Sequence, residues 1–355
     1  MPSYKDRVAK DLDGWIAAGL APESSRAPIL ASIPEGGRLD AAAAMAWVGA
    51  VLLGLAVMAL IAANWDLLPR LAQFALVLGV FGAFAGAAAW CAERARPNLA
   101  NGLLTVAALA FASAVGLTGQ IFDITGNERV ALYLSGVVAA ALALAGRSSG
   151  AMVLALAFIG LGDDWRDGWN GQAALVEVPW LAVAAPAAAA LALRWRSTAL
   201  AHAAAIAVVA EALWLAAKLR FDAAAFLAGA VALAVLAIGA RWLARRREDR
   251  LGGVFYGWFV WGAFAAFIAA GIDLTTHRLG VLHRIVWLAA AGGALALGRN
   301  DRHTPVTAAG VLGLIGAVSV LMLDLGVNLL TAAAVFFVAA AVALVAGLIL
   351  RRRAT

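Results

Sequence analysis

The chain has 355 residues, of which 64% are apolar and only 14% are charged. A soluble domain of this size could not bury so much apolar surface, so the expected solvent is a lipid bilayer. The net charge of +6 is modest and lies in short connections between apolar segments. That distribution is typical of membrane orientation and not of nucleic-acid binding. Cys91 is the single cysteine, which excludes an intrachain disulfide and a cysteine-based metal cluster.

The leader, residues 1–40, is predicted to form two short amphipathic helices. Leu12 and Ile16 belong to an apolar set at helical spacing. Gly19 is expected to end the first helix, and Pro22 to begin the second segment. Two roles stay open for this leader. It could pack on the cytoplasmic ends of a bundle or in the lipid interface, or it could bind a soluble partner.

Residues 41–350 are predicted to form an all-α bundle of about twelve transmembrane helices, followed by a basic tail at 351–355. The first apolar segment is expected to be an uncleaved signal anchor, because the charged leader is too long for the n-region of a signal peptide. The predicted segments are 42–63, 70–91, 99–120, 129–146, 149–162, 173–193, 198–217, 223–243, 251–272, 281–298, 305–323 and 328–350.

The positions of basic residues support an even number of crossings. With twelve crossings and the leader inside, 20 of the 27 basic residues lie on the cytoplasmic side, as the positive-inside rule predicts. Segment 149–162 is short enough to be re-entrant. Omitting it would abolish the charge bias, so we predict that it crosses and that both termini are cytoplasmic.

Aspartates recur near the predicted outer ends of the helices. A carboxylate is unfavourable at a helix C-terminus, so each is predicted to be the N-cap of the following helix, and Asp222 fits best. The alternative is a ring of carboxylates around an outer vestibule that attracts a cation or a hydroxyl-rich ligand. The aspartates are Asp66, Asp123, Asp163, Asp164, Asp222, Asp273 and Asp324.

The outer loop 162–172 and the stretch NWDLLPR carry the candidate ligand residues. Their aspartates, tryptophans and amides are the residue types that bind sugars or cationic groups. The alternative is an interfacial loop with aromatic anchors. Separately, Gln73, Asn101 and Gln120 are expected to be hydrogen-bonding contacts between helices. The candidate vestibule residues are Trp65, Asp66, Gln120, Asp123, Asp164, Trp165, Asp167 and Trp169.

Glu211 is the candidate polar site inside the membrane, at mid-depth of segment 198–217. An ionisable side chain at this depth is unfavourable and marks either a function or a neutral interhelical hydrogen bond. Lys218, seven residues on, is expected to extend towards the interface.

Two stretches, WVGAVLLGLAVMALIAANWDLLPR and LTGQIFDITGNERVALYLSGVVAAALALAGRS, resemble the bacterial predicted membrane proteins classed as domain of unknown function 2157. That family has an Asn-Trp-Asp turn after its first helix and a Gly-Gln-Ile-Phe stretch after its third. The resemblance covers about the first 150 residues, with the family-like membrane part at about 41–150. It implies a multi-pass protein of the bacterial inner membrane and transfers no catalytic residue.

The leading functional hypothesis is a non-enzymatic, transporter-like or ligand-sensing membrane protein. The alternatives are an assembly factor of an envelope complex and an enzyme acting on a lipid-linked sugar at the outer face. P-loop, HExxH and GxSxG motifs are absent, so no metal, cofactor or nucleic acid is predicted. The expected partners are the bilayer, a small-molecule or lipid ligand, and a protein that binds residues 1–40.

Overall fold

The computed structural model describes residues 4–32, 65, 68–123, 127–164, 179–219, 222–247, 250–274, 280–324 and 337. The chain divides into two compact units, Met1–Pro69 and Arg70–Thr355. The predicted first segment, 42–63, lies outside the described residues. So do the predicted last segment, 328–350, apart from Phe337, and the basic tail.

The described part of the first unit is a pair of short helices, α1 (Tyr4–Ala17) and α2 (Arg26–Ser32), joined through a 3-10 turn at Glu23–Ser25. Gly19 lies in the left-handed region with a φ of 72°, which confirms that the chain turns there. Leu12 is buried, and Arg26 Nε donates to Asp13 Oδ1 at 2.8 Å. The described part of the leader is therefore helical, whereas its amphipathic, cytoplasmic or interfacial role stays a prediction.

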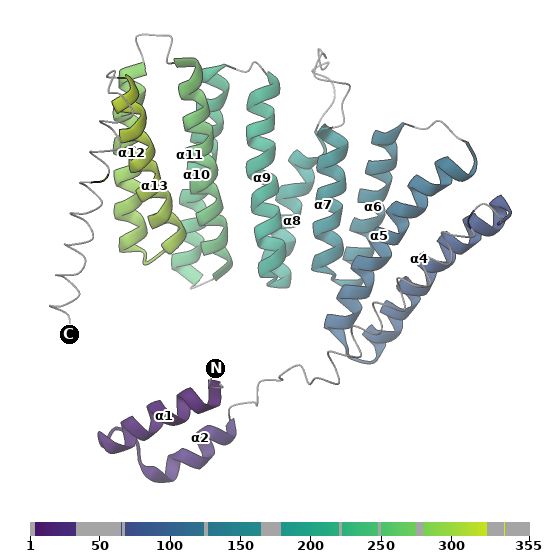
Figure 1. Ribbon diagram of the computed structural model, residues 1–355, viewed down its shortest axis with the longest axis horizontal. Helices are drawn as coiled ribbons and strands as arrows, with labels where there is room; N and C mark the ends of the chain where they lie inside the picture. The colour runs from purple at the N-terminus through teal and green to yellow at the C-terminus, as the bar shows by residue number, and fades with distance from the viewer. Residues whose placement is uncertain are drawn as a thin grey trace. The chain divides into compact units, whose positions relative to one another are not determined.

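The second unit contains ten described α-helices that run alternately up and down beside one another (Figure 1). Consecutive helices pack as hairpins, with α4 on α5, α6 on α7, α8 on α9, α10 on α11 and α12 on α13. The helices are α4 (Arg70–Glu93), α5 (Pro97–Ile121), α6 (Glu128–Gly146), α7 (Ser149–Asp164), α8 (Leu181–Trp195), α9 (Thr198–Leu219), α10 (Ala223–Arg247), α11 (Arg250–Leu274), α12 (Gly280–Asn300) and α13 (Thr304–Asp324).

Eight helices in the described part are long and apolar enough to cross a membrane. Helices α7 and α8 are also apolar but have only 16 and 15 residues, so each is about 22–24 Å long at 1.5 Å per residue. That is shorter than the roughly 30 Å hydrocarbon core. Every element in the described ranges is helical. The all-α class is therefore confirmed, whereas the count of twelve crossings stays a prediction.

The core between the helices is built largely from alanine. On α8, Ala185, Ala188 and Ala192 are fully buried, and they pack in one cluster with Ala201 and Ala204 of α9. Spacings of three and four residues place these side chains on one face of each helix. Small residues on such a face let the helix backbones approach closely, which stabilises helix packing where lipid removes the usual hydrophobic driving force.

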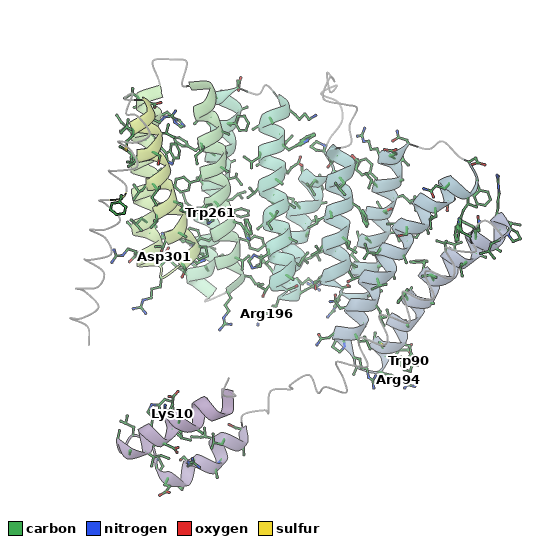
Figure 2. The ribbon with its side chains drawn as sticks, in the orientation of Figure 1. Lys10, Trp90, Arg94, Arg196, Trp261 and Asp301 are labelled. Carbon is green, nitrogen blue, oxygen red and sulfur yellow. The ribbon has the colours of Figure 1, made fainter. Side chains whose placement is uncertain are left out.

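Short turns join the helices at the end of the second unit that we call the basic end, where Arg94, Arg196 and Asp301 lie (Figure 2). Arg147 and Arg196 end α6 and α8 in the left-handed conformation, with φ near 50°. The next residue is a serine whose N–H donates to the carbonyl five residues earlier, at 3.0 Å for Ser148 and 3.1 Å for Ser197. The serine oxygens then cap the following helices. An Arg-Ser pair thus ends one helix and begins the next.

Asn101 confirms the predicted contact between helices. Its side-chain oxygen accepts from Ser148 Oγ at 2.7 Å and from the Gly150 N–H at 3.3 Å. This amide therefore ties α5 to the turn between α6 and α7.

Candidate functional site

The predicted outer vestibule is described only at some of its residues. Trp65 is half-buried, and Gln120 is exposed at the end of α5. Asp123 is exposed, and its carboxylate pairs with Arg70 at 2.8 Å. Asp164 is the last residue of α7. Asp66, Trp165, Asp167 and Trp169 lie outside the described residues, so the vestibule stays a prediction.

The capping prediction holds for some aspartates and is wrong for others. Asp222 Oδ1 accepts from the Ala225 N–H at 2.8 Å, as expected for the cap of α10. Asn127, and not Asp123, caps α6 through the Arg129 N–H. Asp123 does not cap α6 because it lies beside the Arg70 guanidinium, a charged donor that competes with backbone N–H groups for the carboxylate. Asp324 pairs with Arg284 Nε at 3.1 Å, and the start of the segment that it was predicted to cap lies outside the described residues.

Asp163 accepts hydrogen bonds from backbone N–H groups at the start of α8, as the capping prediction expects. It is only 2% exposed. Its carboxylate accepts from the Tyr133 hydroxyl at 2.5 Å and from the Leu181 N–H at 2.7 Å. Because Leu181 begins α8, this carboxylate joins the end of α7 to the start of α8 and to α6.

Glu211 is 6% exposed in α9, so its carboxyl group faces protein and not lipid. Lys218 is exposed, and its ammonium lies 5.7 Å from the centre of the Trp214 ring. The burial agrees with an interhelical position for Glu211, whereas its role in a site stays a prediction.

A groove of about 560 Å³ runs along the membrane-spanning part of α10, α11 and α12, and we call it the α10–α12 groove. On α10 it extends from Leu227 to Arg241, a distance of about 21 Å along the helix axis. Helix α11 packs on both α10 and α12 and forms the floor. The rim residues Val231, Ile238 and Leu297 are exposed, so the groove opens sideways to the surrounding medium.

Small residues create the hollow. Gly293 lines the groove and is exposed, and an added Cβ there would meet no heavy atom within 4 Å. A larger side chain at this position would therefore enter the groove from its open side. The small residues that line it are Ala230, Ala234 and Ala237 on α10 and Ala290, Gly293 and Ala294 on α12.

The groove is polar at its basic end. Arg241 lines it and donates to Asp301 through Nε at 2.5 Å and Nη2 at 3.0 Å. Arg245 pairs with the same carboxylate. The Arg241 guanidinium lowers the pKa of Asp301, chiefly by hydrogen bonding. Asp301, in the turn between α12 and α13, is thereby held ionised against α10.

Tyr256 completes this polar end from α11. It lines the groove and is 4% exposed. Its hydroxyl lies within electrostatic reach of Asp301 and Arg241 but makes no hydrogen bond of normal geometry to any described residue. The His303 ring lies 5.1 Å from the Tyr256 ring, and His303 Nε2 donates to the Gly253 carbonyl at 3.0 Å. A buried hydroxyl in this state is unfavourable unless something supplies an acceptor.

The opposite end of the groove is closed by a second buried cluster. Phe267 lines the groove and stacks on His283 at 4.2 Å. His283 Nε2 donates to the Phe267 carbonyl at 2.9 Å, and Nδ1 accepts from Arg284 at 3.2 Å. Because Arg284 also pairs with Asp324, these contacts join α11, α12 and α13.

No pattern in the sequence predicted Arg241, Tyr256 and Asp301 as site residues. Arg241 lies in a cluster of basic residues, and Asp301 is 60 residues away in the chain. The one available signal was Tyr256 itself, because a hydroxyl in an apolar helix needs a partner. No spacing in the sequence indicates that these three residues meet.

These features define a polytopic α-helical membrane protein with a lateral apolar groove. The model of the family described as "Predicted membrane protein (DUF2157)" matches residues 13–152, which confirms the resemblance of the first 150 residues. The match begins within α1 and ends within α7, so it does not include the groove. No curated protein and no solved structure matches the chain.

Proposed function

We propose that this protein is a non-enzymatic, ligand-binding protein of the bacterial inner membrane, with the basic end in the cytoplasm and one apolar chain of a membrane amphiphile held in the α10–α12 groove. The observation that supports this proposal is an apolar groove that opens sideways and has a polar end at Arg241 and Tyr256. Its volume lies within the range of small-molecule sites. A sensor or a carrier of lipid would use such a site.

The lining of the groove favours an apolar chain as its occupant. The groove is lined mostly by apolar side chains and opens sideways to the surrounding medium. One acyl chain of a membrane amphiphile matches this lining, and the bilayer itself supplies such chains. A helix inserted by an assembly factor is the alternative occupant.

The polar end lies on the wrong side for the enzyme hypothesis. Arg241 and Tyr256 lie near Asp301, which is at the basic end (Figure 2), and the positive-inside rule assigns this end to the cytoplasm. An enzyme acting on a lipid-linked sugar at the outer face would need its polar groups at the opposite end. Glu211 is not part of the groove lining, so this site does not depend on the candidate intramembrane acid.

The test fills the groove at Gly293. The full-length wild type, Gly293→Leu and the control Gly292→Leu are purified in a mild non-ionic detergent, and retained phospholipid is counted by native mass spectrometry. An added Cβ on Gly292 also meets nothing within 4 Å, but Gly292 does not line the groove. Both variants replace a helical glycine, so any gain in helix propensity is shared.

We expect Gly293→Leu to lose a bound phospholipid that the wild type and Gly292→Leu retain. Equal retention by all three proteins would overturn the proposal. It would mean that the groove holds no lipid chain, or that another segment of the chain fills it.

A further inference from the structure

The polar end of the groove determines which amphiphile binds. We propose that the α10–α12 groove selects an amphiphile with an oxyanion head, a phosphate or a carboxylate, which Arg241 and Tyr256 hold at the basic end. This inference rests on the proposed function, because the acyl chain bound in the groove places the head of the amphiphile at the basic end. It goes further by naming the charge and the chemistry of the ligand.

The first support is the charge balance. Arg241 and Arg245 contribute two positive charges against the single carboxylate of Asp301. The Asp301 side chain is 8% exposed, and that of Arg241 is largely buried. The Arg245 side chain is 53% exposed, so the surplus positive charge lies at the open end of the groove, where it attracts an anion. A bound oxyanion would neutralise the group.

The second support is the supply of hydrogen-bond donors. Asp301 takes two donors of Arg241, and a guanidinium has five. The Tyr256 hydroxyl adds a donor that lies near Asp301 and Arg241 but makes no hydrogen bond of normal geometry to a described residue. An oxyanion accepts several hydrogen bonds at once, whereas a neutral apolar ligand would leave the hydroxyl unsatisfied. The donors at this end therefore match an anionic head.

A purely structural role for Arg241 predicts different behaviour. On that view the arginine only joins α10 to the turn between α12 and α13, and Tyr256 only fills space. Tyr256→Phe separates the two views, because it removes the hydroxyl without breaking a hydrogen bond to any described residue. Arg246→Gln is the control for loss of charge, since Arg246 is on the same helix and lies 4.5 Å over the Trp242 ring.

The experiment measures the affinity of the full chain in detergent for three probes: phosphatidylglycerol, diacylglycerol and oleate. Diacylglycerol has the same acyl chains but no oxyanion. We expect the wild type to bind phosphatidylglycerol or oleate at least tenfold more tightly than diacylglycerol. Tyr256→Phe should weaken binding of the preferred anion about tenfold, as loss of a hydrogen bond to a charged group predicts. It should leave binding of diacylglycerol unchanged, and Arg246→Gln should resemble the wild type.

Asp301→Asn should change the affinity for the anionic probe in the opposite direction. It removes the internal carboxylate, so binding of the anionic probe should become tighter relative to diacylglycerol. Preference for phosphatidylglycerol assigns the head as a phosphate, and preference for oleate assigns it as a carboxylate.

Equal affinity for all three probes in the wild type, or an unchanged Tyr256→Phe, would overturn the inference. That failure differs from failure of the proposed function, which Gly293→Leu tests through all lipids regardless of charge.

Discussion

The carboxylate of Asp163 accepts a hydrogen bond from the Leu181 N–H at 2.7 Å, across a gap of 18 residues. This contact anchors the start of α8 to the end of α7. Because Asp163 also binds the Tyr133 hydroxyl, removing the carboxylate leaves buried donors on two elements.

Asp163→Ala should therefore lower the free energy of unfolding more than an ordinary cap does. An exposed cap is worth about 1 kcal/mol, and buried unsatisfied donors add roughly 1–3 kcal/mol. Thermal unfolding in detergent compares Asp163→Ala with the control Asp222→Ala, which removes only the cap of Ala225. Equal losses would show that the Asp163 network contributes no more than one cap.

The ion pair between Arg70 and Asp123 should contribute little to stability. Both side chains are mostly exposed, and exposed pairs are typically worth below about 1 kcal/mol. Asp123→Asn should leave the thermal midpoint nearly unchanged at high salt. If Asp123 instead serves a vestibule, the same variant should fail in a cellular assay at normal protein level.

Acid should weaken the contact between α10 and the turn after α12. The pKa of Asp301 is lowered by its hydrogen bond to Arg241. Its stabilisation is therefore complete above the unfolded value of about 3.9 and is lost as the pH falls through the folded value. The wild type should be more stable than Asp301→Asn at pH 7. This difference should shrink below about pH 4 in unfolding measurements, and a constant difference would contradict the prediction.

Glu211→Gln tests the protonation state of the buried acid in α9. If Glu211 is neutral, the amide should preserve its hydrogen bonding, and the protein level and thermal midpoint should stay close to those of the wild type. A severe folding defect would indicate a charged, paired carboxylate. Glu211→Ala is the control that removes the group altogether.

Cysteine-accessibility labelling tests the orientation. With Cys91 replaced, single cysteines near Arg196, Arg246 and Thr355 should react from the cytoplasmic side, and those near Asp164 and Asp273 from the outside. Outside labelling at Thr355 would exclude an even number of crossings. The charge bias that motivates this prediction is independent of the groove.

The sequence alone determined where most of the described helices lie. The prediction placed segments at 70–91 and 223–243, and the structure has helices at Arg70–Glu93 and Ala223–Arg247. Helix positions are predictable because each segment that spans the lipid must satisfy its own backbone hydrogen bonds. The length of an apolar run in the local sequence is therefore enough to predict a helix. Asp222 and Gly19 were predictable for the same reason, since caps and turns depend on nearby residues.

Only the tertiary structure decided where small residues leave space and which charges meet. Ala188 and Ala234 are the same residue in apolar helices, yet the first packs in the core and the second lines the groove. The difference lies in the neighbouring helix and not in the local sequence. Arg241 and Asp301 are likewise 60 residues apart. Their contact exists because α11 holds α10 and α12 side by side, a relationship that no local pattern encodes.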